Sequence, residues 1–499
     1  MNNSIYDSII LSKTGSQIPL LKNGKTVESR YNPEREAQVI IQDAKNKANS
    51  SLFLVFGIGS GILIKGLLEE FPDCKIIAVE RYKEDIEFLS QIALISNLKK
   101  NSSVIFTYAQ NLTECLCNNT LPAKYGMPHI IELRAWMQEN IECKNELEEA
   151  VNKAFRIISA DYSVQAHFGK IWMHNILGNL TLLSEMHDNI STQALYKKID
   201  RNKTALILAA GPSLDKKFEK IKNNRQSYYI ISTDTASQSL RKSKCNADAV
   251  ISIDGQNVSV NHFSGNVSKD TLYFFDLCAS SSAAKYISSQ NASLIYFSSG
   301  HPMCSLAGNF PQIFSGAGTV TIAAADLAFK LGFKKVIVLG ADFAYSEGKA
   351  YTGGTYLESL NSLNENKLIS SEKKYDTLMF RTELQHCENN KKTTEILRAY
   401  KSSFIDYLKL NEITFEYKDD EYHLFQDKEI KNHFFIKENF KIHDFLNYCA
   451  NCKAEEIETA LLPYIAYLRK QDENKNTQYS EFLKLAQTYI VRYNEIYEK

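Results

Sequence analysis

The chain has 499 residues, more than an ordinary single domain, so two or three domains are expected, each able to bury its own core. Apolar residues make up 44% of the sequence, a value typical of globular proteins. The 58 Lys and Arg residues balance 58 Asp and Glu residues, and this formal net charge of +0 gives no reason to expect nucleic acid or an anionic membrane as a partner.

The sequence shows no signal for export or membrane insertion. No N-terminal stretch joins a basic region to an apolar core, and no run approaches the roughly 18 apolar residues of a spanning helix. A cytoplasmic protein with reduced thiols is therefore predicted. Of its ten cysteines, Cys115-x-Cys117 and Cys449-x-x-Cys452 each have the spacing of half a zinc site. Neither has a partner pair, so we predict no metal site.

Residues 51–160 alternate apolar runs with helical patterns, as in the βαβ repeat of a doubly wound sheet. Strands are expected in SLFLVFGIGSG, KIIAVER, SSVIFTY and PHIIEL. We assign residues 1–137 to an N-terminal Rossmann-like domain of the α/β class. Residues 138–200 lack strand signals and are predicted to form a helical connector.

A glycine-rich loop follows the first of these strands. Gly57, Gly59 and Gly61 precede a helix, and Glu80 lies about 20 residues on, at the end of the next strand. This spacing suits a carboxylate that binds a ribose, and the loop resembles the cofactor loop of S-adenosylmethionine methyltransferases. No methyltransferase catalytic motif follows the later strands. A scaffold or oligomer-contact role is therefore favoured over cofactor binding.

Residues 201–345 show a stronger α/β pattern. Strands are expected in TALILAAG, SYYIISTD, ADAVISID, TLYFFD, SLIYFSS and KKVIVLGAD, and an apolar helix in TVTIAAADLAFKLG. The polar residues 355–395 are predicted to be a mobile excursion, and helices with one short strand, ITFEYK, follow it. We assign residues 201–420 to a central α/β domain and 421–499 to a helical C-terminal region.

Glycine and short polar side chains follow several of the central strands. They are Gly211, Pro212, Ser213, Thr233, Asp234, Asp254, Gly255 and Asp342. In an open parallel sheet the ligand crevice lies outside the carboxyl ends of the strands. Glycine lets a ligand approach the backbone, and the next helix offers N–H groups to an anion. A nucleotide or another phosphate-bearing ligand is therefore expected at residues 211–214.

Two stretches carry a family resemblance: LILAAGPSL, and SGAGTVTIAAADLAFKLGFKKVIVLGADFAYSEGKAY downstream. In this order and spacing they resemble the central domain of the motility accessory factor family, which are bacterial flagellin glycosyltransferases. They are also similar to small bacterial sialyltransferases that use a CMP-activated nine-carbon sugar. The resemblance covers roughly residues 200–420. It implies a sialyltransferase-like Rossmann-type central domain in which Gly211, Pro212 and Ser213 hold the CMP donor.

The resemblance extends to single residues. Asp342 matches the acidic residue of a Gly-x-Asp-Phe motif, Tyr351 a tyrosine beside the donor phosphate, and Thr319 lies near a Ser-Gly that precedes the apolar helix. Ala210 stands where the sialyltransferases have Asn, and Ala344 where they have a second tyrosine. Those two donor contacts are then lost or supplied elsewhere. For Thr233, Asp234, Asp254 and Gly255 the donor-binding assignment rests on their strand-end positions.

Sugar transfer to a hydroxyl also requires a base. The departing group is already a phosphate, which backbone N–H groups and a tyrosine can stabilise, so no metal cofactor is expected. A histidine near neutrality can take the acceptor proton. His386 is the nearest match to the histidine of the sialyltransferases, and His301, after a strand end, is its rival. Asp254 or Asp342 takes this role if neither histidine does.

The resemblance thus predicts an enzyme that moves a nonulosonic acid, such as pseudaminic or legionaminic acid, from CMP onto Ser or Thr of flagellin in the cytoplasm. Its partners are the sugar donor and flagellin, without nucleic acid or membrane, and its oligomeric state stays open. One alternative is a pterin diphosphokinase of the same domain family that uses ATP and Mg²⁺, with Asp234, Asp254 and Asp342 as metal ligands. Another is a non-catalytic chaperone that binds flagellin.

Overall fold

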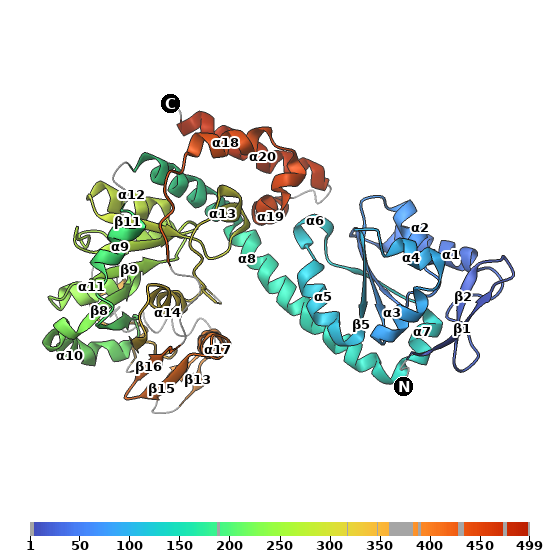
Figure 1. The fold of residues 1–499 in the computed structure, drawn as a ribbon, viewed down its shortest axis with the longest axis horizontal. Helices are drawn as coiled ribbons and strands as arrows, with labels where there is room; N and C mark the ends of the chain where they lie inside the picture. The colour runs from blue at the N-terminus through green and yellow to red at the C-terminus, as the bar shows by residue number, and fades with distance from the viewer. Residues whose placement is uncertain are drawn as a thin grey trace, which may run out of the picture. The chain divides into compact units, whose positions relative to one another are not determined.

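The computed structural model describes residues 4–186, 190–316, 318–346, 348–358, 383–387, 391–427, 434–472 and 477–497. The chain divides into two compact units (Figure 1). The first comprises Met1–Gly169 with Leu462–Phe482, and the second Lys170–Leu461 with Leu483–Lys499. The α/β class predicted from the sequence is confirmed, since each unit contains a parallel sheet with helices. In the described part of the chain, no helix has the length and apolar character needed to cross a membrane.

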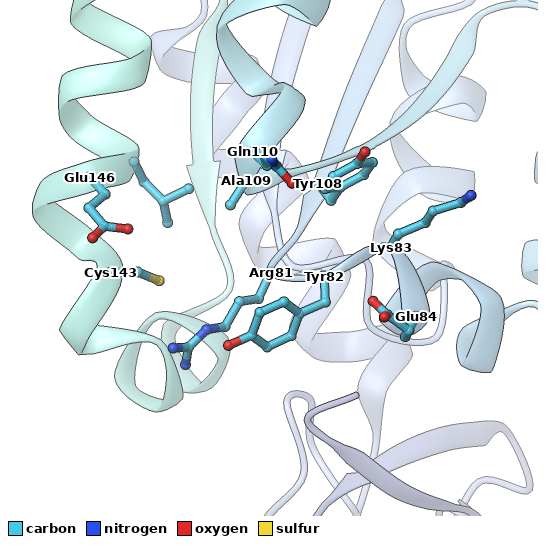
Figure 2. Close-up of a pocket in the computed structure, with 10 residues that line it drawn as sticks. Arg81, Tyr82, Lys83, Glu84, Tyr108, Ala109, Gln110, Cys143 and Glu146 are labelled. Carbon is cyan, nitrogen blue, oxygen red and sulfur yellow. The ribbon is translucent and has the colours of Figure 1, made fainter. Parts of the chain in front are cut away.

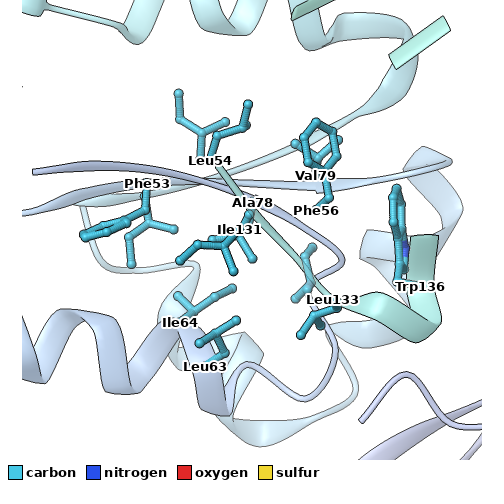
Figure 3. Packing of buried hydrophobic residues seen from close by; sticks show 14 of the residues in the cluster. Phe53, Leu54, Phe56, Leu63, Ile64, Ala78, Val79, Ile131, Leu133 and Trp136 are labelled. Atoms are coloured by element: carbon cyan, nitrogen blue, oxygen red, sulfur yellow. The ribbon is translucent and has the colours of Figure 1, made fainter. Parts of the chain in front are cut away.

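The first unit is built on a four-stranded parallel sheet in the order β5-β4-β3-β6. Its strands are β3 (Leu52–Phe56), β4 (Lys75–Glu80), β5 (Val104–Tyr108) and β6 (His129–Glu132), as the apolar runs predicted. Its helices are α1 (Pro33–Lys47), α2 (Ile62–Glu70), α3 (Lys83–Leu89), α4 (Ala93–Leu98), α5 (Leu112–Asn119), α6 (Pro122–Tyr125) and α7 (Arg134–Glu139). Every residue of β3 is buried, because side chains pack on both faces of the strand (Figure 3).

One feature of this unit was not predicted, and the predicted connector is helical. An antiparallel hairpin, β1 (Tyr6–Leu11) and β2 (Gln17–Leu21), precedes the sheet and places Tyr6 in the core. The helical residues predicted as a connector contain α8 (Lys144–Glu185), which starts in the first unit and ends in the second, and α9 (Thr192–Lys198).

The second unit contains an eight-stranded sheet in the order β11-β10-β9-β8-β7-β12-β16-β15. The parallel strands are β7 (Thr204–Leu208), β8 (Tyr228–Thr233), β9 (Ala249–Ser252), β10 (Leu272–Asp276), β11 (Ser293–Phe297) and β12 (Lys335–Leu339). From β7 the chain moves outward through β8 to β11 and then returns to β12 on the other side of β7. The strand order therefore reverses between β7 and β12, and ligands of open α/β sheets bind at such a point.

The sheet continues beyond the boundary predicted at residue 420. The strands β15 (Thr414–Lys418) and β16 (Glu421–Phe425) form a hairpin, and β16 pairs antiparallel with β12. The turn residues Asp419 and Asp420 both have positive φ, as a two-residue hairpin turn requires. Because the usual glycine of such turns is missing, the sequence did not reveal this hairpin.

The remaining helices of the second unit surround this sheet. They are α10 (Phe218–Asn223), α11 (Asp234–Lys242), α12 (Ser281–Ser289), α13 (Pro302–Ala307), α14 (Val320–Lys330), α17 (Glu395–Leu410) and α18 (Ile442–Asn451). The predicted apolar helix is α14, and nine of its eleven residues are buried, because it packs against four strands of the sheet. The last two helices of the chain are α19 (Ala454–Gln471) and α20 (Tyr479–Tyr497), so the C-terminal tail is helical as predicted.

Candidate functional site

The turn after β7 closes against the end of β12. The N–H of Gly211 donates to the carbonyl of Gly340 over 2.8 Å, and the N–H of Ser213 donates to Asp342 Oδ2 over 3.0 Å. A Cβ on Gly211 would lie 2.2 Å from Asp342 Oδ2 and 2.4 Å from the Gly340 carbonyl oxygen. The sequence analysis attributed the missing side chain of Gly211 to a bound ligand. On this side of the turn, however, the Asp342 carboxylate and the Gly340 carbonyl fill the space that a side chain would occupy.

A downstream loop is fixed over the same turn. The carbonyl of Ala210 accepts the N–H of Thr352 over 2.8 Å, and Asp215 accepts the N–H of Gly353 over 2.8 Å. Lys349 pairs with Asp215 at 3.1 Å. Although burial raises the pKa of Asp215, hydrogen bonds from Thr352, Gly353 and Lys349 outweigh this and lower it. The loop that carries Tyr351 is thus held by defined bonds, and Ala210 takes part through its backbone.

Two buried hydroxyls at the ends of adjacent strands lack partners. Ser213 Oγ follows β7 and Thr233 Oγ1 ends β8, and neither has a hydrogen-bond partner in the described part of the chain. Buried polar groups in proteins are paired in the large majority of cases. These two hydroxyls are therefore available to a ligand or a water, as are other buried hydroxyls without a partner in the described part of the chain, such as those of Ser239 and Ser259. Pro212, between the turn glycine and Ser213, begins the 3-10 helix η3 (Pro212–Lys217).

Two carboxylates and two tyrosines lie at the ends of β8 and β9. Asp234 Oδ2 accepts the hydroxyl of Ser252 over 2.7 Å. Burial raises the pKa of Asp254, and the nearby charge of Asp234 raises it further. Burial also raises the pKa of Tyr351 and Tyr356, and Asp234 contributes to both shifts. The ends of β8 and β9 therefore combine acidic acceptors from the sheet with phenol hydroxyls from the loop.

His262 belongs to this group, and sequence reasoning missed it. Its side chain is buried, and its ring meets Tyr356 edge-on with centroids 4.5 Å apart. The Nδ1 atom has no partner in the described residues, and the imidazole lowers the pKa of Asp254. A lone histidine at the end of the 3-10 helix η5 (Asn257–His262) gives no signal that would have identified it.

A cavity of about 340 Å³ lies beside Asp342. It is lined by Asp342, Phe343, Ala344, His386, Cys387, Lys391, Thr393, Arg398, Lys401, Tyr417 and Asp420. Its volume falls in the range of small-molecule sites. His386 and Asp342 thus line the same cavity.

Lys391 supplies a fixed positive charge in this cavity. Its Nζ lies 3.2 Å from Asp342 Oδ1 and 2.8 Å from Asp420 Oδ1. Although burial lowers the pKa of Lys391, the two carboxylates outweigh this and raise it. Sequence reasoning missed Lys391 because it lies in the polar excursion, of which residues 359–382 and 388–390 fall outside the described part. The short strands β13 (Gln385–His386) and β14 (Lys392–Thr393) pair with each other and position both His386 and Lys391.

The other predicted residues lie outside this cavity lining. His301 caps α13, where its Nδ1 accepts the N–H of Met303 over 3.1 Å, and burial lowers its pKa to about 4. Thr319 precedes α14 as its N-cap residue without a side-chain capping bond. The carbonyl of Gly255 accepts the side-chain amide of Asn175 over 2.8 Å.

Within the described residues, a single group of three potential metal ligands has its ligand atoms within 4.8 Å of one another: Cys278, His301 and Cys304. The three aspartates proposed for a diphosphokinase, Asp234, Asp254 and Asp342, do not form such a group, nor do the two cysteine pairs noted in the sequence. A Mg²⁺ ion near these aspartates would need the phosphates of a substrate as further ligands.

The glycine-rich loop of the first unit is filled from within. Glu80 accepts the N–H of Ile58 over 2.7 Å, the hydroxyl of Tyr6 over 3.0 Å and the indole N–H of Trp136 over 2.6 Å. Burial raises its pKa to about 8. A Cβ on Gly57 would lie 2.8 Å from the Trp136 side chain, which Figure 3 shows at the end of the core.

A second buried carboxylate occupies the same loop. Glu28 accepts the N–H of Ser60 over 2.8 Å and its hydroxyl over 3.0 Å, and burial raises the Glu28 pKa to about 7. A cavity of about 600 Å³ lies beyond the ends of β4 and β5 (Figure 2). It is lined by Arg81, Tyr82, Lys83, Glu84, Tyr108, Ala109, Gln110, Cys143, Glu146 and Leu147. The glycines of the loop are not among these lining residues.

The fold defines an α/β protein whose strand order reverses between β7 and β12, the point at which ligands of open α/β sheets bind. Residues 175–348 match the family described as 6-hydroxymethylpterin diphosphokinase MptE-like. A Treponema pallidum (strain Nichols) protein, described as uncharacterized, is 35% identical over 154 residues, which are 30% of this chain and 67% of that protein. The chain belongs to the same family as that Treponema protein.

Three further similarities were found. A second uncharacterized Treponema pallidum (strain Nichols) protein is 35% identical over 136 residues, which are 26% of this chain. The chain spans about half (49%) of the length of that relative. A release factor glutamine methyltransferase from Buchnera aphidicola subsp. Baizongia pistaciae is 30% identical over 24% of this chain and 44% of its own length. The solved structure of a Maf glycosyltransferase from Magnetospirillum magneticum AMB-1 aligns with 97% of this chain and 85% of its own, at 11% identity and a TM-score of 0.46.

Proposed function

We propose that the chain is a glycosyltransferase that moves a nonulosonic acid of the pseudaminic or legionaminic type from its CMP-activated donor onto Ser or Thr of flagellin. In this proposal the modification precedes flagellin export from the cytoplasm and is needed for flagellar assembly and motility. The observation that carries it is the pair of unpartnered buried hydroxyls, Ser213 and Thr233, which follow β7 and end β8 next to the strand-order reversal. The resemblance of residues 205–214 and 315–351 to CMP-sugar transferases gives the ligand its identity.

The donor half of the site is proposed to hold the phosphate. The hydroxyls of Ser213 and Thr233 donate to its oxygens, and the hydroxyl of Tyr351 approaches from the loop. As the bond between the anomeric carbon and the phosphate oxygen breaks, both electrons stay with CMP. Fixed donors that favour this charge lower the barrier without having to reorganise.

The acceptor half is proposed to lie in the cavity beside Asp342. The hydroxyl oxygen of the acceptor attacks the anomeric carbon, and His386 removes its proton. Lys391 is fixed by Asp342 and Asp420, so its charge supports the carboxylate of the sugar or the departing phosphate. These residues perform the reaction without a metal ion.

The match of residues 175–348 to the diphosphokinase-like family favours a second candidate. A pterin diphosphokinase transfers diphosphate from ATP to a hydroxymethyl group and needs Mg²⁺. Asp234 and Asp254 lie close enough for the charge of one to act on the other, and two carboxylates with substrate phosphates are a common Mg²⁺ site.

Calorimetric titration with CMP and with ATP plus Mg²⁺ separates these candidates. A ligand present at 100 times its Kd adds about 2.7 kcal/mol of apparent stability, so thermal denaturation gives an independent reading. Binding of CMP, abolished in the double variant Ser213→Ala/Thr233→Val, supports the transferase. Binding of ATP only with Mg²⁺ supports the kinase, and binding of neither supports a chaperone.

A metal test adds a second criterion. The transferase is expected to remain active in EDTA, because protein groups hold the departing phosphate. Loss of activity in EDTA that Mg²⁺ or Mn²⁺ restores would contradict the transferase mechanism and favour the kinase.

A further inference from the structure

Three side chains with metal-binding atoms lie close together near β10 and β11 of the eight-stranded sheet, whereas the proposed donor turn follows β7. Cys278 follows β10, His301 follows β11, and Cys304 lies in the first turn of α13, one turn after His301. One ligand atom from each lies within 4.8 Å of the other two. None of the three lines the cavity that contains His386.

The surroundings of these side chains are those of a buried site. Cys278 is 7% exposed and Cys304 1% exposed. The Nε2 atom of His301 is buried and has no hydrogen-bond partner in the described residues. Buried cysteines alone are ordinary core residues. One ring nitrogen of His301 lies within 4.8 Å of both thiol sulfurs, and its Nε2 has no partner in the described residues, which a core role leaves unexplained.

We propose that Cys278, His301 and Cys304 bind a zinc-class divalent cation. Two thiolates and one imidazole are ligands that Zn²⁺ prefers, and three protein ligands leave one position of a tetrahedral ion for water or a carboxylate. Bonds of about 2.3 Å to sulfur and 2.0 Å to nitrogen would place the ligand atoms roughly 3.5–3.8 Å apart. From separations of up to 4.8 Å, the three atoms therefore need to approach one another by about 1.3 Å at most.

Binding exchanges several bonds and protons. Each thiol loses its proton to solvent, so two thiols and Zn²⁺ give a bis-thiolate complex and two protons. With Nε2 on the metal, the neutral ring carries its proton on Nδ1, and the hydrogen bond that Nδ1 accepts from the N–H of Met303 is lost. A single hydrogen bond is small compared with the binding free energy of a structural zinc ion.

The position of this site suggests what the metal does. The side-chain amide of Asn175 donates to the carbonyls of Gly255, over 2.8 Å, and Cys278, over 3.0 Å. The N–H of Ser280 donates to the carbonyl of Asp254 over 2.9 Å. A metal on Cys278 would therefore fix the backbone beside the Asp254–Gly255 turn and act as a brace for that edge of the crevice.

The experiment measures metal content in the full chain, purified under reducing conditions without a polyhistidine tag. Elemental analysis by mass spectrometry is expected to find one zinc per chain. The variants Cys304→Ser and His301→Gln are expected to lose it, whereas Cys245→Ser, at another buried free cysteine, keeps it. Zinc retained at full occupancy in both ligand variants would overturn the proposal.

Cobalt substitution of the wild type covers the case in which a variant fails to fold. Reduced protein with Co²⁺ is expected to show a thiolate-to-cobalt charge-transfer band and the intense visible bands of tetrahedral cobalt. Their absence, together with no zinc after purification, would overturn the proposal. So would a native Cys278–Cys304 disulfide, seen as a mass lower by two hydrogens. CMP titration is a separate measurement, so this proposal and the transferase proposal can fail independently.

Discussion

Two glycine turns, one in each unit, follow a buried parallel strand and precede a helix, yet the protein treats them differently. At Gly57–Gly61 the chain fills the loop itself, because Trp136, Glu80 and Glu28 occupy the space and the polar groups that a cofactor would use. At Gly211 the chain fills one side with Asp342 but leaves the hydroxyls of Ser213 and Thr233 buried and without partners.

A glycine in a strand-end turn therefore indicates that another atom lies close to the backbone, but it does not show whether that atom belongs to a ligand or to the protein. Both turns need bare backbone, and in both the structure identifies a protein atom that requires it. A candidate site differs from a scaffold in whether the surrounding polar groups already have hydrogen-bond partners within the protein. Glu80 has such partners, whereas the hydroxyls of Ser213 and Thr233 have none in the described residues.

The largest expected effect is on the proposed sugar transfer by the second unit. If the proposed function holds, His386→Ala is expected to lower flagellin glycosylation by roughly 10²–10⁴-fold, because the acceptor hydroxyl then loses its proposed general base. The Kd for CMP is expected to stay unchanged, because the base faces the acceptor. Initial rates with a CMP-sugar and flagellin give the first value, and calorimetry gives the second.

The control for this variant is His443→Ala, an exposed histidine on α18 outside the cavity, which is expected to keep the wild-type rate. His301→Ala is expected to affect zinc content rather than the chemical step. If His301→Ala abolishes transfer while His386→Ala remains active, the assignment of the base is wrong. If both remain active, the proton goes to another group such as Asp254 or Asp342.

The second effect tests the difference between polar groups with and without a hydrogen-bond partner in the protein. Thr233→Val and Ser213→Ala each are expected to raise the Kd for CMP by roughly 10–100-fold, because a hydrogen bond to a charged group contributes about 1.5–3 kcal/mol. Thermal stability is expected to change little, since neither hydroxyl has a protein partner in the described residues to lose. Calorimetry and thermal denaturation measure the two quantities.

A matched control gives the opposite outcome. Thr271 Oγ1 donates to the carbonyl of Ala247 over 2.8 Å, so Thr271→Val is expected to lower stability and leave CMP affinity unchanged. A loss of stability in Thr233→Val as large as in Thr271→Val would show that Thr233 is a structural residue. Gly211→Val cannot serve as a probe of binding, because its side chain would meet the carbonyl of Gly340.

The third effect is a pH dependence of the first unit. The pKa values of Glu28 and Glu80, raised by burial to about 7 and about 8, exceed their usual value of 4.5. Between these values the folded state holds protons that the unfolded state has released, so stability is expected to fall as pH rises. The contribution is fully present below about pH 4.5 and is lost as pH rises through 7 to 8.

Denaturant unfolding followed by Trp136 fluorescence, in a Trp172→Phe background, measures this dependence across pH 5 to 8. Glu80→Gln is expected to make the stability of the unit less dependent on pH, because the amide does not ionise. An equally steep dependence in Glu80→Gln and in the wild type would show that Glu80 is not the titrating group.

Much of the fold could be predicted from the sequence, because buried parallel strands are continuous apolar runs between helical patterns. Four strands of the first unit and six parallel strands of the second lie where those runs predicted. The hairpin β1–β2 was not predicted, and of the hairpin β15–β16 only the strand β15 was. The Asp419-Asp420 turn lacks the glycine that usually reveals a two-residue hairpin.

The candidate site was predicted from strand ends and, for His386 and Tyr351, from the family resemblance. Asp234, Asp254 and Asp342 follow strands, so topology alone brings them to one edge. His262, Lys391 and the thiol of Cys278 come from loops or from turns without a motif. Their approach depends on tertiary contacts such as the Lys391–Asp342 ion pair, which residue spacing does not encode.

The smallest expected effect is a null result with S-adenosylmethionine. The methyltransferase-like glycine loop, together with the similarity to a release factor glutamine methyltransferase, makes this cofactor the natural ligand to test on the first unit. Glu80, which the spacing predicts as a ribose ligand, already accepts three hydrogen bonds from the protein, and Trp136 packs where the loop needs space. The cavity beyond β4 and β5 is not lined by the glycines, so the glycine loop is not placed to bind the amino acid part of the cofactor there. Thermal denaturation is therefore expected to show no shift at millimolar S-adenosylmethionine. A clear shift would contradict this expectation. If Trp136→Phe kept that shift and Tyr108→Ala, in the cavity lining, abolished it, the cavity alone would be a binding site. The difference between a glycine turn filled by protein atoms and one with unpartnered hydroxyls would then not predict function.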